Sequence, residues 1–401
     1  MGDGPAEPAT RCIPRSRVVV VLVVLAALLT TILSTVTVAT PSSATPGHRR
    51  KQSPAALVVG QPSPSIAARA SSVSCPTPQR CWVVGSEDLG GIRKAWIEMT
   101  HDGGFAWRPQ RAPASVSTLS SISCTSDSGC VAVGTSTEGQ AITVLTRDGG
   151  STWTIGGPLA GASEATSVDC RTVFTCIAIV ASGAASWSVR TGNGGLSWQR
   201  DGDLPPGFSG PGPLFCSSTE RCLVAGYTPI APARGTGAIA STADGGSTWA
   251  LDALPQGVGL LHGVACLANL CIAVGTASTT DTAVIPAKGM LLRSDDAGRT
   301  WATSPWPAGL SDAFGINCVA PATCVVVGTS WLTGRPAIPT GFAITTINRA
   351  GSWQLARTRY VANGLVSIDC GSQAACVAVG GSEVATVRVP SASVQPAGIG
   401  S

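Results

Sequence analysis

Fourteen of the 15 cysteines in this 401-residue chain fall into seven closely spaced pairs, six as Cys-x5-Cys and one as Cys-x4-Cys. The pairs are Cys75 with Cys81, Cys124 with Cys130, Cys170 with Cys176, Cys216 with Cys222, Cys266 with Cys271, Cys318 with Cys324, and Cys370 with Cys376. Such pairs suit either disulfides or thiolate ligands for a metal. A tetrahedral metal site needs four ligands, whereas each pair offers two, and the chain adds only three histidines, His48, His101 and His262. The spacing favours seven disulfides, and we expect no metal and no cofactor.

A second motif follows six of the pairs and reads Ser/Thr-x-Asp/Asn-x-Gly-x-x-Trp, with Ala350 in place of Gly in the sixth copy. Its acidic or amide residues are Asp102, Asp148, Asn193, Asp244, Asp296 and Asn348. Its tryptophans are Trp107, Trp153, Trp198, Trp249, Trp301 and Trp353. A short Asp or Asn side chain can accept hydrogen bonds from its own turn, and Gly adopts positive φ without steric cost. The motif, called the box below, therefore predicts a structural turn, with Trp filling the space between neighbouring sheets.

The pairs and boxes repeat with a period near 50 residues, and each repeat offers four short strands. Apolar runs such as 131–134 and 325–328 follow the second Cys, as expected for strands buried on both faces. A third strand, for example 141–146, precedes each box, and a fourth begins at its Trp. This period is typical of propeller blades. We expect an all-β, seven-bladed β-propeller with four-stranded blades over residues 55–390, preceded by one N-terminal transmembrane or signal helix.

The boxes resemble the Asp-box (BNR) repeat of β-propellers, and the resemblance covers residues 55–390. That superfamily includes sialidases, xyloglucan-type glycosidases and sortilin-like receptors. The seven-blade count and the short Gly-Gly-x-x-Trp boxes look most like the photosystem II stability and assembly factor propellers. This resemblance implies a rigid disc that binds another protein during assembly of a complex, without implying photosynthesis. The disulfide pairs and the membrane segment depart from that family.

The seventh repeat has a Cys pair and a third strand (383–389) but no box, so its outer strand must come from elsewhere. In most repeats Trp precedes the next first Cys by 17 residues, as Trp107 precedes Cys124. Counting the same distance back from Cys75 reaches Val58, inside the apolar segment 55–60. We expect this segment to complete the last blade and close the ring, which removes the exposed sheet edges.

Residues 18–40 form a 23-residue stretch without charge, about 34 Å long as a helix. Arg11, Arg15 and Arg17 precede it, which places residues 1–17 in the cytoplasm. The stretch is either an uncleaved signal anchor or a secretory signal, because 30–40 turns polar. Residues 41–54 then form a Ser/Pro-rich linker, and 391–401 a C-terminal tail. We expect a single-pass cell-membrane protein with its propeller outside the cytoplasm, or alternatively a secreted one.

The formal net charge of +4 comes entirely from the N-terminal 54 residues, which carry six basic and two acidic side chains. The remaining residues hold 20 of each sign, so the propeller is neutral. A neutral surface does not favour nucleic acid as a partner.

Candidate partner-binding residues lie on the face that carries the loops between second and third strands. The loops 227–237, 276–288 and 329–340 are long, and long loops on one arc suggest a binding surface. A ring of residues six positions before each first Cys should surround the channel mouth: Arg69, Thr118, Glu164, Gly210, Leu260, Asp312 and Gly364. The partner-binding candidates are Arg69, Tyr227, Arg234, His262, Lys288, Trp331 and Arg335. Insertions that drift freely and solvated rim charges would leave the same patterns.

Enzymatic signals are sparse. Glu164 with Asp312 is the one carboxylate pair that we nominate for glycoside hydrolysis. A sialidase needs a Tyr nucleophile with a Glu partner, and the two tyrosines, Tyr227 and Tyr360, do not adjoin a Glu in sequence. We expect a non-enzymatic protein-binding or assembly platform in the cell envelope. A glycan-binding or glycoside-hydrolysing propeller and a purely structural envelope protein are the alternatives.

Overall fold

The computed structural model describes residues 56–59, 68–231, 234–277, 288–332, 338–358, 361–372, 375–381 and 383–389. Within these ranges the chain forms 29 β-strands. No helix in the same ranges is long and apolar enough to cross a membrane. The segments 1–17, 18–40, 41–54 and 391–401 lie outside the described residues, so their assignments stay predictions.

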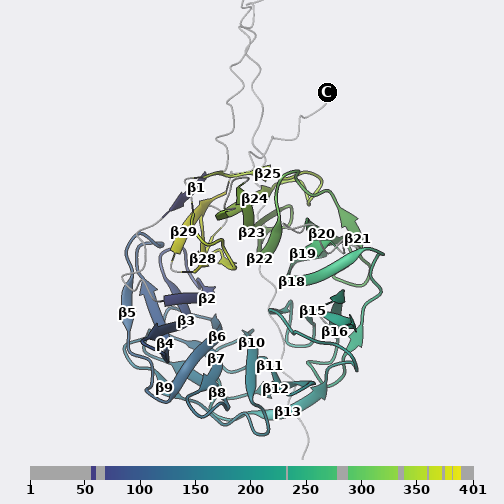
Figure 1. The fold of residues 1–401 in the computed structure, drawn as a ribbon. Coiled ribbons are helices and arrows are strands. Elements are labelled where there is room, and N and C mark those ends of the chain that lie inside the picture. The colour runs from purple at the N-terminus through teal and green to yellow at the C-terminus, as the bar shows by residue number, and fades with distance from the viewer. Residues whose placement is uncertain are drawn as a thin grey trace, which may run out of the picture. The chain divides into compact units, whose positions relative to one another are not determined.

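The strands form seven antiparallel sheets, or blades, arranged in a ring (Figure 1), which confirms the predicted seven-bladed β-propeller. The first strands, which surround the centre, are β2 (Ala68–Ser74), β6 (Val116–Cys124), β10 (Glu164–Cys170), β14 (Leu214–Cys216), β18 (Val258–Leu267), β22 (Asp312–Ala320) and β27 (Ser367–Asp369). The second strands are β3 (Cys81–Leu89), β7 (Cys130–Ser136), β11 (Cys176–Ser182), β15 (Cys222–Ala231), β19 (Leu270–Ala277), β23 (Thr323–Leu332) and β28 (Ala375–Gly380). The third strands are β4 (Ile92–Thr100), β8 (Ala141–Thr146), β12 (Ala185–Thr191), β16 (Arg234–Thr242), β20 (Gly289–Ser294), β24 (Ile338–Thr346) and β29 (Glu383–Arg388). The outer strands are β5 (Arg108–Gln110), β9 (Thr154–Ile155), β13 (Gln199–Asp203), β17 (Ala250–Leu251), β21 (Ala302–Ser304), β25 (Gln354–Leu355) and β1 (Ala56–Val59).

The predicted closing strand is confirmed, because β1 is the outer strand of blade seven. It pairs antiparallel with β29, with Ala56 opposite Arg388 and Val59 opposite Ala385. A short fifth strand, β26 (Arg357–Thr358), pairs with β1 in parallel. Blades seven and one also meet at an isolated bridge between Ala70 and Gly381. The first described strand therefore completes the sheet formed by the last described strands.

All seven predicted cysteine pairs form disulfides, with Cα–Cα distances of 3.9–4.1 Å. Each disulfide joins the region where a first strand ends to the beginning of the second strand. Cys170 lies directly opposite Cys176 in the β10–β11 register, and Cys266 lies opposite Cys271 in the β18–β19 register. A chain with this many disulfides belongs to an oxidising compartment.

The second cysteine of each pair is a core residue as well as a disulfide partner. All seven are buried: Cys81, Cys130, Cys176, Cys222, Cys271, Cys324 and Cys376. Cys271, for example, belongs to the apolar cluster between blades four and five, Cys324 to the one between blades five and six, and Cys376 to the one between blades six and seven. These cysteines are therefore structural residues of the interior, and the structure does not place them on a functional surface.

Three of these cysteines differ from the sequence expectation in their place on the strand. The predicted second strand follows the second Cys, and in blades one to four it begins at that Cys. In blades five, six and seven it begins one residue earlier, so Cys271, Cys324 and Cys376 are each the second residue of their strand. In blades five and six the ladder continues past the disulfide, with Leu267 opposite Leu270 and Ala320 opposite Thr323. In blades five and six strand pairing therefore extends into the disulfide turn.

The six boxes form the same hydrogen-bonded turn. In the second box the Thr146 hydroxyl accepts from Gly150 N at 2.8 Å, and Asp148 Oδ1 accepts from Thr152 N at 2.9 Å. Gly149 N donates to Ser128 O at 3.0 Å, which ties the box to the disulfide turn of its own blade. Such bonds, the first from the Thr248 side chain, lower the pKa of Asp244 to about 2. The predicted structural role of these turns agrees with this geometry.

The sixth box departs from the others where Gly is missing. Arg349 and Ala350 adopt positive φ values of 58° and 61°, which side chains with a Cβ rarely do. Ala350 N still donates to the Thr346 hydroxyl at 3.1 Å, so the turn keeps its hydrogen bond at the cost of local strain.

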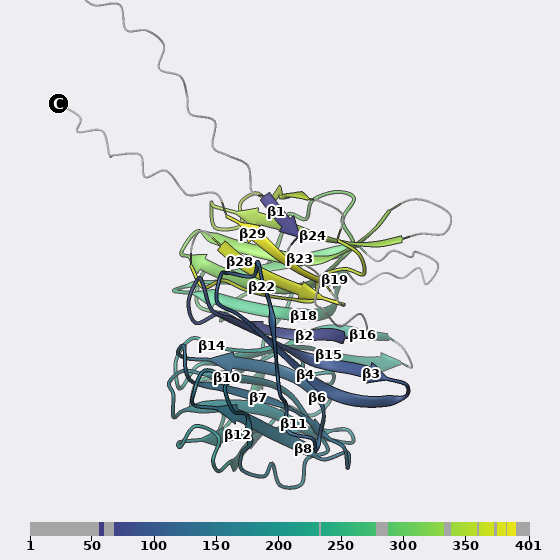
Figure 2. The same ribbon diagram turned by 90° about the vertical axis from the view of Figure 1, so that its left-hand side faces the viewer.

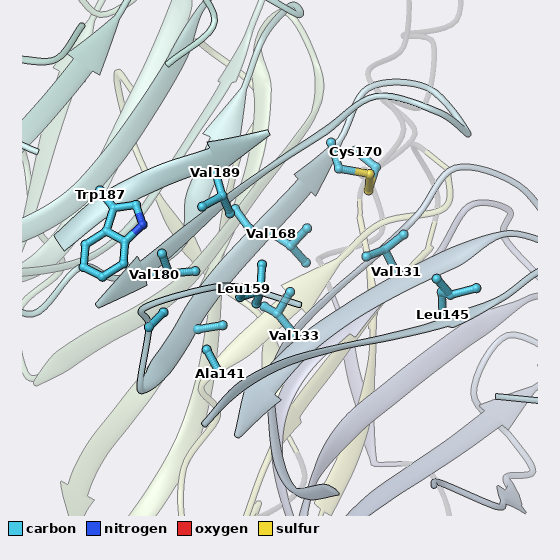
Figure 3. Close-up of a cluster of buried hydrophobic side chains, with 14 residues drawn as sticks. Val131, Val133, Ala141, Leu145, Leu159, Val168, Cys170, Val180, Trp187 and Val189 are labelled. Atoms are coloured by element: carbon cyan, nitrogen blue, oxygen red, sulfur yellow. A yellow bond between two sulfur atoms is a disulfide. The ribbon is translucent and has the colours of Figure 1, made fainter. Parts of the chain in front are cut away.

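The core consists of clusters between neighbouring blades. Figure 3 shows the one between blades two and three, where Val131 and Leu145 face Val168, Val180 and Trp187. Second strands are buried on both sides, as their continuous apolar runs predict.

Side chains also connect the first strands of successive blades. At four junctions the residue before the first Cys accepts a hydrogen bond from the first Cys N–H of the next blade. The acceptors and donors are Ser74 and Cys124 N (3.0 Å), Ser123 and Cys170 N (3.0 Å), Asp169 and Cys216 N (2.8 Å), and Asp369 and Cys75 N (2.6 Å). Blades four and five carry Phe215 and Ala265 at this position, which have no acceptor side chain.

Deleting residues 55–60 should lower the melting temperature by roughly 5–10 °C, because blade seven loses the outer strand that closes the ring. Differential scanning calorimetry measures this change. The control removes six residues, 45–50, from the predicted linker. Equal melting temperatures for the two deletions would contradict the role of β1.

Alkylation of the denatured protein without reductant should modify none of the 14 paired cysteines, because all are in disulfides. Peptide mass spectrometry reads the result, and a reduced sample shows that every site can react. Labelling of several paired cysteines before reduction would count against the seven disulfides.

Candidate functional site

The first strands enclose a central hollow of about 320 Å³ that is lined by residues from all seven blades. On one side the lining is hydroxylic, with Ser72, Ser121 and Ser167 from blades one to three. On the other side it is largely apolar and aromatic, with His262 and Phe314 from blades five and six. The hollow is therefore chemically asymmetric within a nearly symmetric ring.

Three of the six serines that line this hollow connect neighbouring blades: Ser72, Ser121 and Ser367. Ser72 Oγ accepts from Ile122 N at 3.3 Å, and Ser121 Oγ accepts from Val168 N at 3.2 Å. Ser167 differs, because its hydroxyl is buried and has no hydrogen-bond partner among the described residues. Ser72 and Ser121 are thus structural acceptors, and their hydrogen bonds do not include a base that would activate them as nucleophiles.

His262 lies against Phe314, with ring centroids 4.9 Å apart. Burial lowers the pKa of His262, so its imidazole is neutral at pH 7. The described lining of the hollow contains no carboxylate that could act with it. In the described parts of the chain, no three His, Cys, Asp or Glu residues are grouped so as to hold a metal ion. The hollow can accept a small polar ligand but does not present an acid–base pair within its described lining.

The nominated carboxylates lie at the ends of inner strands and do not line this hollow. Glu164 begins β10 in blade three and is exposed. Asp312 begins β22 in blade six, and burial raises its pKa. Arg69, the second residue of β2, is exposed opposite Ser86. The structure places all three at strand ends without joining them into one site.

The other candidates are distributed over the face that carries the second-to-third-strand connections. Tyr227 in β15 is half-buried, and its ring fills the space beside Gly210 and Gly235. Trp331 in β23 is half-buried opposite Pro339, and Lys288 is exposed just before β20. The backbone of Arg234 begins β16. Arg335 lies outside the described residues.

For two of the three predicted long loops the prediction is wrong, because the segments form strands. Strands β15 and β16 pair out to Ala231 opposite Arg234, and β23 and β24 pair out to Leu332 opposite Ile338. Segments 227–237 and 329–340 are therefore largely extended hairpins. Their β-branched residues, such as Thr228, suit strands despite the intervening Gly and Pro. Most of the third predicted loop, residues 278–287, lies outside the described residues.

Sequence reasoning missed a third extended hairpin. Strands β3 and β4 in blade one pair out to Leu89 opposite Ile92, around Gly90 and Gly91. Leu89 is 48% exposed and Ile92 63% exposed. A Gly-Gly pair between two strand patterns is a signal for such a two-residue turn. Figure 2 shows that the β3–β4, β15–β16 and β23–β24 hairpins project toward the same side of the ring.

Two half-buried carboxylates were also missed. Asp369 accepts from Cys75 N at 2.6 Å and from Asn317 Nδ2 at 2.7 Å. Desolvation, with repulsion from Asp169, raises the pKa of Asp369 to about 6. Desolvation also raises the pKa of Asp169, although Arg171 lies 3.8 Å away. Both residues directly precede the first Cys of a blade, where they act as connectors.

No family model matches the chain, and no curated protein sequence does. The solved structures give a fold match. The chain shares its fold with YCF48. A structure of YCF48 bound to D1 peptide matches with a TM-score of 0.59 and 15% identity, over 85% of this chain and 98% of that chain. YCF48 from Cyanidioschyzon merolae matches with a TM-score of 0.56 and 14% identity, over 84% and 99%.

The Niastella koreensis GH74 enzyme has a similar propeller, with a TM-score of 0.58 and 15% identity. The match covers 82% of this chain and 53% of that chain. At such identities the likeness to YCF48 and to the GH74 enzyme shows the fold and nothing more. It confirms the propeller class that the repeats predict.

The raised pKa of Asp369 predicts a pH-dependent stability. Between the ordinary value of 3.8 and about 6 the folded protein holds a proton that the unfolded chain releases. The contribution of Asp369 to stability is therefore greatest at low pH and is lost as pH rises through about 6, by up to about 3 kcal/mol. Urea unfolding at pH 4.5 and 7.5 measures the change.

The variant Asp369→Asn should remove this part of the pH dependence, because Asn does not ionise. The control Asp203→Asn, at an exposed site, should keep the wild-type slope. Parallel pH curves for the wild type and Asp369→Asn would contradict the assignment.

Proposed function

We propose that this chain is a non-enzymatic protein-binding platform that acts outside the cytoplasm. The observation that carries the proposal is the set of exposed apolar side chains on the projecting hairpins. Ile230 in β15 is 71% exposed, and Leu89 and Ile92 form the tip of the β3–β4 hairpin. Exposed large apolar side chains on projecting hairpins can contribute to protein-interaction surfaces.

The scaffold supports this role. Ring closure by β1 and one disulfide in every blade hold the hairpins on a rigid base, which lowers the entropy lost on binding. The fold is also that of YCF48, which was solved bound to D1 peptide. That finding concerns YCF48, but it demonstrates that such a ring can hold a peptide.

The cellular setting follows from the sequence and the disulfides together. We place the chain in the cell envelope, anchored by residues 18–40, with secretion after signal cleavage as the alternative. An oxidising compartment suits the seven disulfides. The partner is then another envelope protein, and the role is assembly of a complex. The balanced charge of the propeller does not favour nucleic acid.

A glycan-binding or glycoside-hydrolysing propeller is the second candidate. Its support is the fold shared with the GH74 enzyme and the raised pKa of Asp312, since a general acid needs a protonated carboxyl. The described lining of the hollow does not contain the carboxylate pair that hydrolysis requires, so binding is favoured over catalysis. A purely structural envelope protein would present the ring without a partner on either face.

In-cell photo-crosslinking tests the platform. Benzoylphenylalanine at Trp331 or Ile92 should yield a discrete protein adduct, because both positions lie on the hairpin face. The matched probe at Thr125, in the disulfide turn of blade two on the opposite face, should yield none. Gel shift and mass spectrometry identify the partner.

Adducts of equal intensity from both faces would contradict a specific hairpin-face platform. If neither face yields an adduct but the purified protein cleaves a glycan, and Glu164→Gln or Asp312→Asn abolishes cleavage, the glycosidase replaces the platform. With neither adduct nor cleavage, the structural role remains.

A further inference from the structure

A second hollow, of about 570 Å³, lies between blades four and five on the face of the boxes and disulfide turns. Its walls include the apolar side chains of Phe215, Leu223 and Trp249. Its size is in the range of cavities that hold small organic ligands. We refer to it as the inter-blade cavity.

The repeats allow this junction to be compared with the preceding one. Arg190 in β12 pairs with Ile177, the residue after Cys176. Ser241 in β16 pairs with Leu223, the residue after Cys222, so Ser241 occupies the position of Arg190. By the same logic Asp252 corresponds to Asp201, because each is the third residue after its box Trp.

Between blades three and four the Asp has a cationic partner from its own chain. Arg190 Nε lies 3.4 Å from Asp201 Oδ2, and the two side chains occupy the junction. Between blades four and five the Asp is retained, but Ser replaces the Arg. Ser241 Oγ donates to Asp252 Oδ1 at 2.6 Å, and Trp301 Nε1 donates to Oδ2 at 3.1 Å. Replacing a long Arg with Ser leaves room at this junction, and Ser241 and Asp252 both line the cavity.

The carboxylate of Asp252 has hydrogen-bonding positions left for a cation. A carboxylate offers about four lone-pair positions, and the Ser241 and Trp301 hydrogen bonds use two of them. Desolvation raises the pKa of Asp252, and the charge of nearby Arg221 offsets part of that rise. A bound cation would lower the pKa further. Arg190 shows that a guanidinium is accommodated in the equivalent environment one blade earlier.

The cavity lining also carries positive charge. Arg299 lies in the exposed part of the fifth box and lines the cavity, as does the half-buried Arg221. Arg221 Nη1 donates to Ala297 O over 3.5 Å, which leaves further guanidinium donors. Guanidinium groups bind carboxylates strongly and often with two parallel hydrogen bonds.

We propose that the inter-blade cavity binds a free basic amino acid, with its side-chain guanidinium or ammonium on Asp252 and its α-carboxylate on Arg221 and Arg299. The one anion and the two cations of the lining match the two ends of such a ligand. The apolar walls contact the methylene chain between those ends. This site is separate from the hairpin face, and its test does not depend on the proposed platform.

Isothermal titration of the full chain with L-arginine tests the proposal. The wild type should bind. Asp252→Asn should lower the affinity at least roughly tenfold, because a charge-assisted pair is lost. Ser241→Arg should abolish binding, because it recreates the Arg–Asp pair of the preceding junction inside the cavity. The matched control Asp201→Asn, one junction earlier, should bind like the wild type.

Two analogues separate the ends of the ligand. Citrulline, which is neutral where arginine is charged, should not bind, and agmatine, which lacks the carboxylate, should bind roughly tenfold more weakly. Absence of arginine binding, equal binding of citrulline, or unchanged binding by Ser241→Arg would overturn the proposal. Melting temperatures show whether each variant is folded. If Ser241→Arg does not fold, the comparison of arginine with citrulline on the wild type decides between the outcomes.

Discussion

The structure depends on how the backbone hydrogen-bonding groups at the inner edge of each blade find partners. Each first strand is the edge of its own sheet and has backbone N–H groups that point toward the preceding blade. A set of buried N–H groups without hydrogen-bond partners would cost more free energy than the small net stability of a domain. Ser74, Ser123, Asp169 and Asp369 solve this by accepting those N–H groups across the junctions. Blade spacing, and with it the width of the channel, follows from these short side chains.

The same constraint explains why the ring is not uniform. Phe215 cannot accept a hydrogen bond, and it packs instead against the apolar clusters on either side of blade five. The junction that follows Phe215 is also the one that contains the inter-blade cavity. Polar connection at some junctions and apolar packing at others make the junctions of this seven-bladed ring unequal.

Much of the fold could be predicted from sequence because the repeated motifs mark each blade. The Trp-to-Cys spacing located β1 as the partner of β29, and the Cys pairs located every disulfide. The candidate sites were harder to predict, because they depend on contacts between residues of different strands and blades. The pairing of Asp252 with Ser241, in contrast to Asp201 with Arg190, becomes visible only when strand registers are known. The hairpin at Gly90 did have a local signal, whereas the extension of β15 past Tyr227 was masked by Gly and Pro.

The closing strand also has a consequence for how the chain reaches its native state. Val58 pairs with Thr386, more than 300 residues later, so the ring cannot close until Thr386 has been synthesised. Each disulfide, by contrast, joins cysteines five or six positions apart, so it can form as soon as its blade emerges. Folding thus combines early local cross-links with one late contact of very high sequence separation, the class of contact that slows folding. Until that contact forms, the edge of β29 is open to pairing with other chains, and assembly of the last blade is the step most exposed to aggregation.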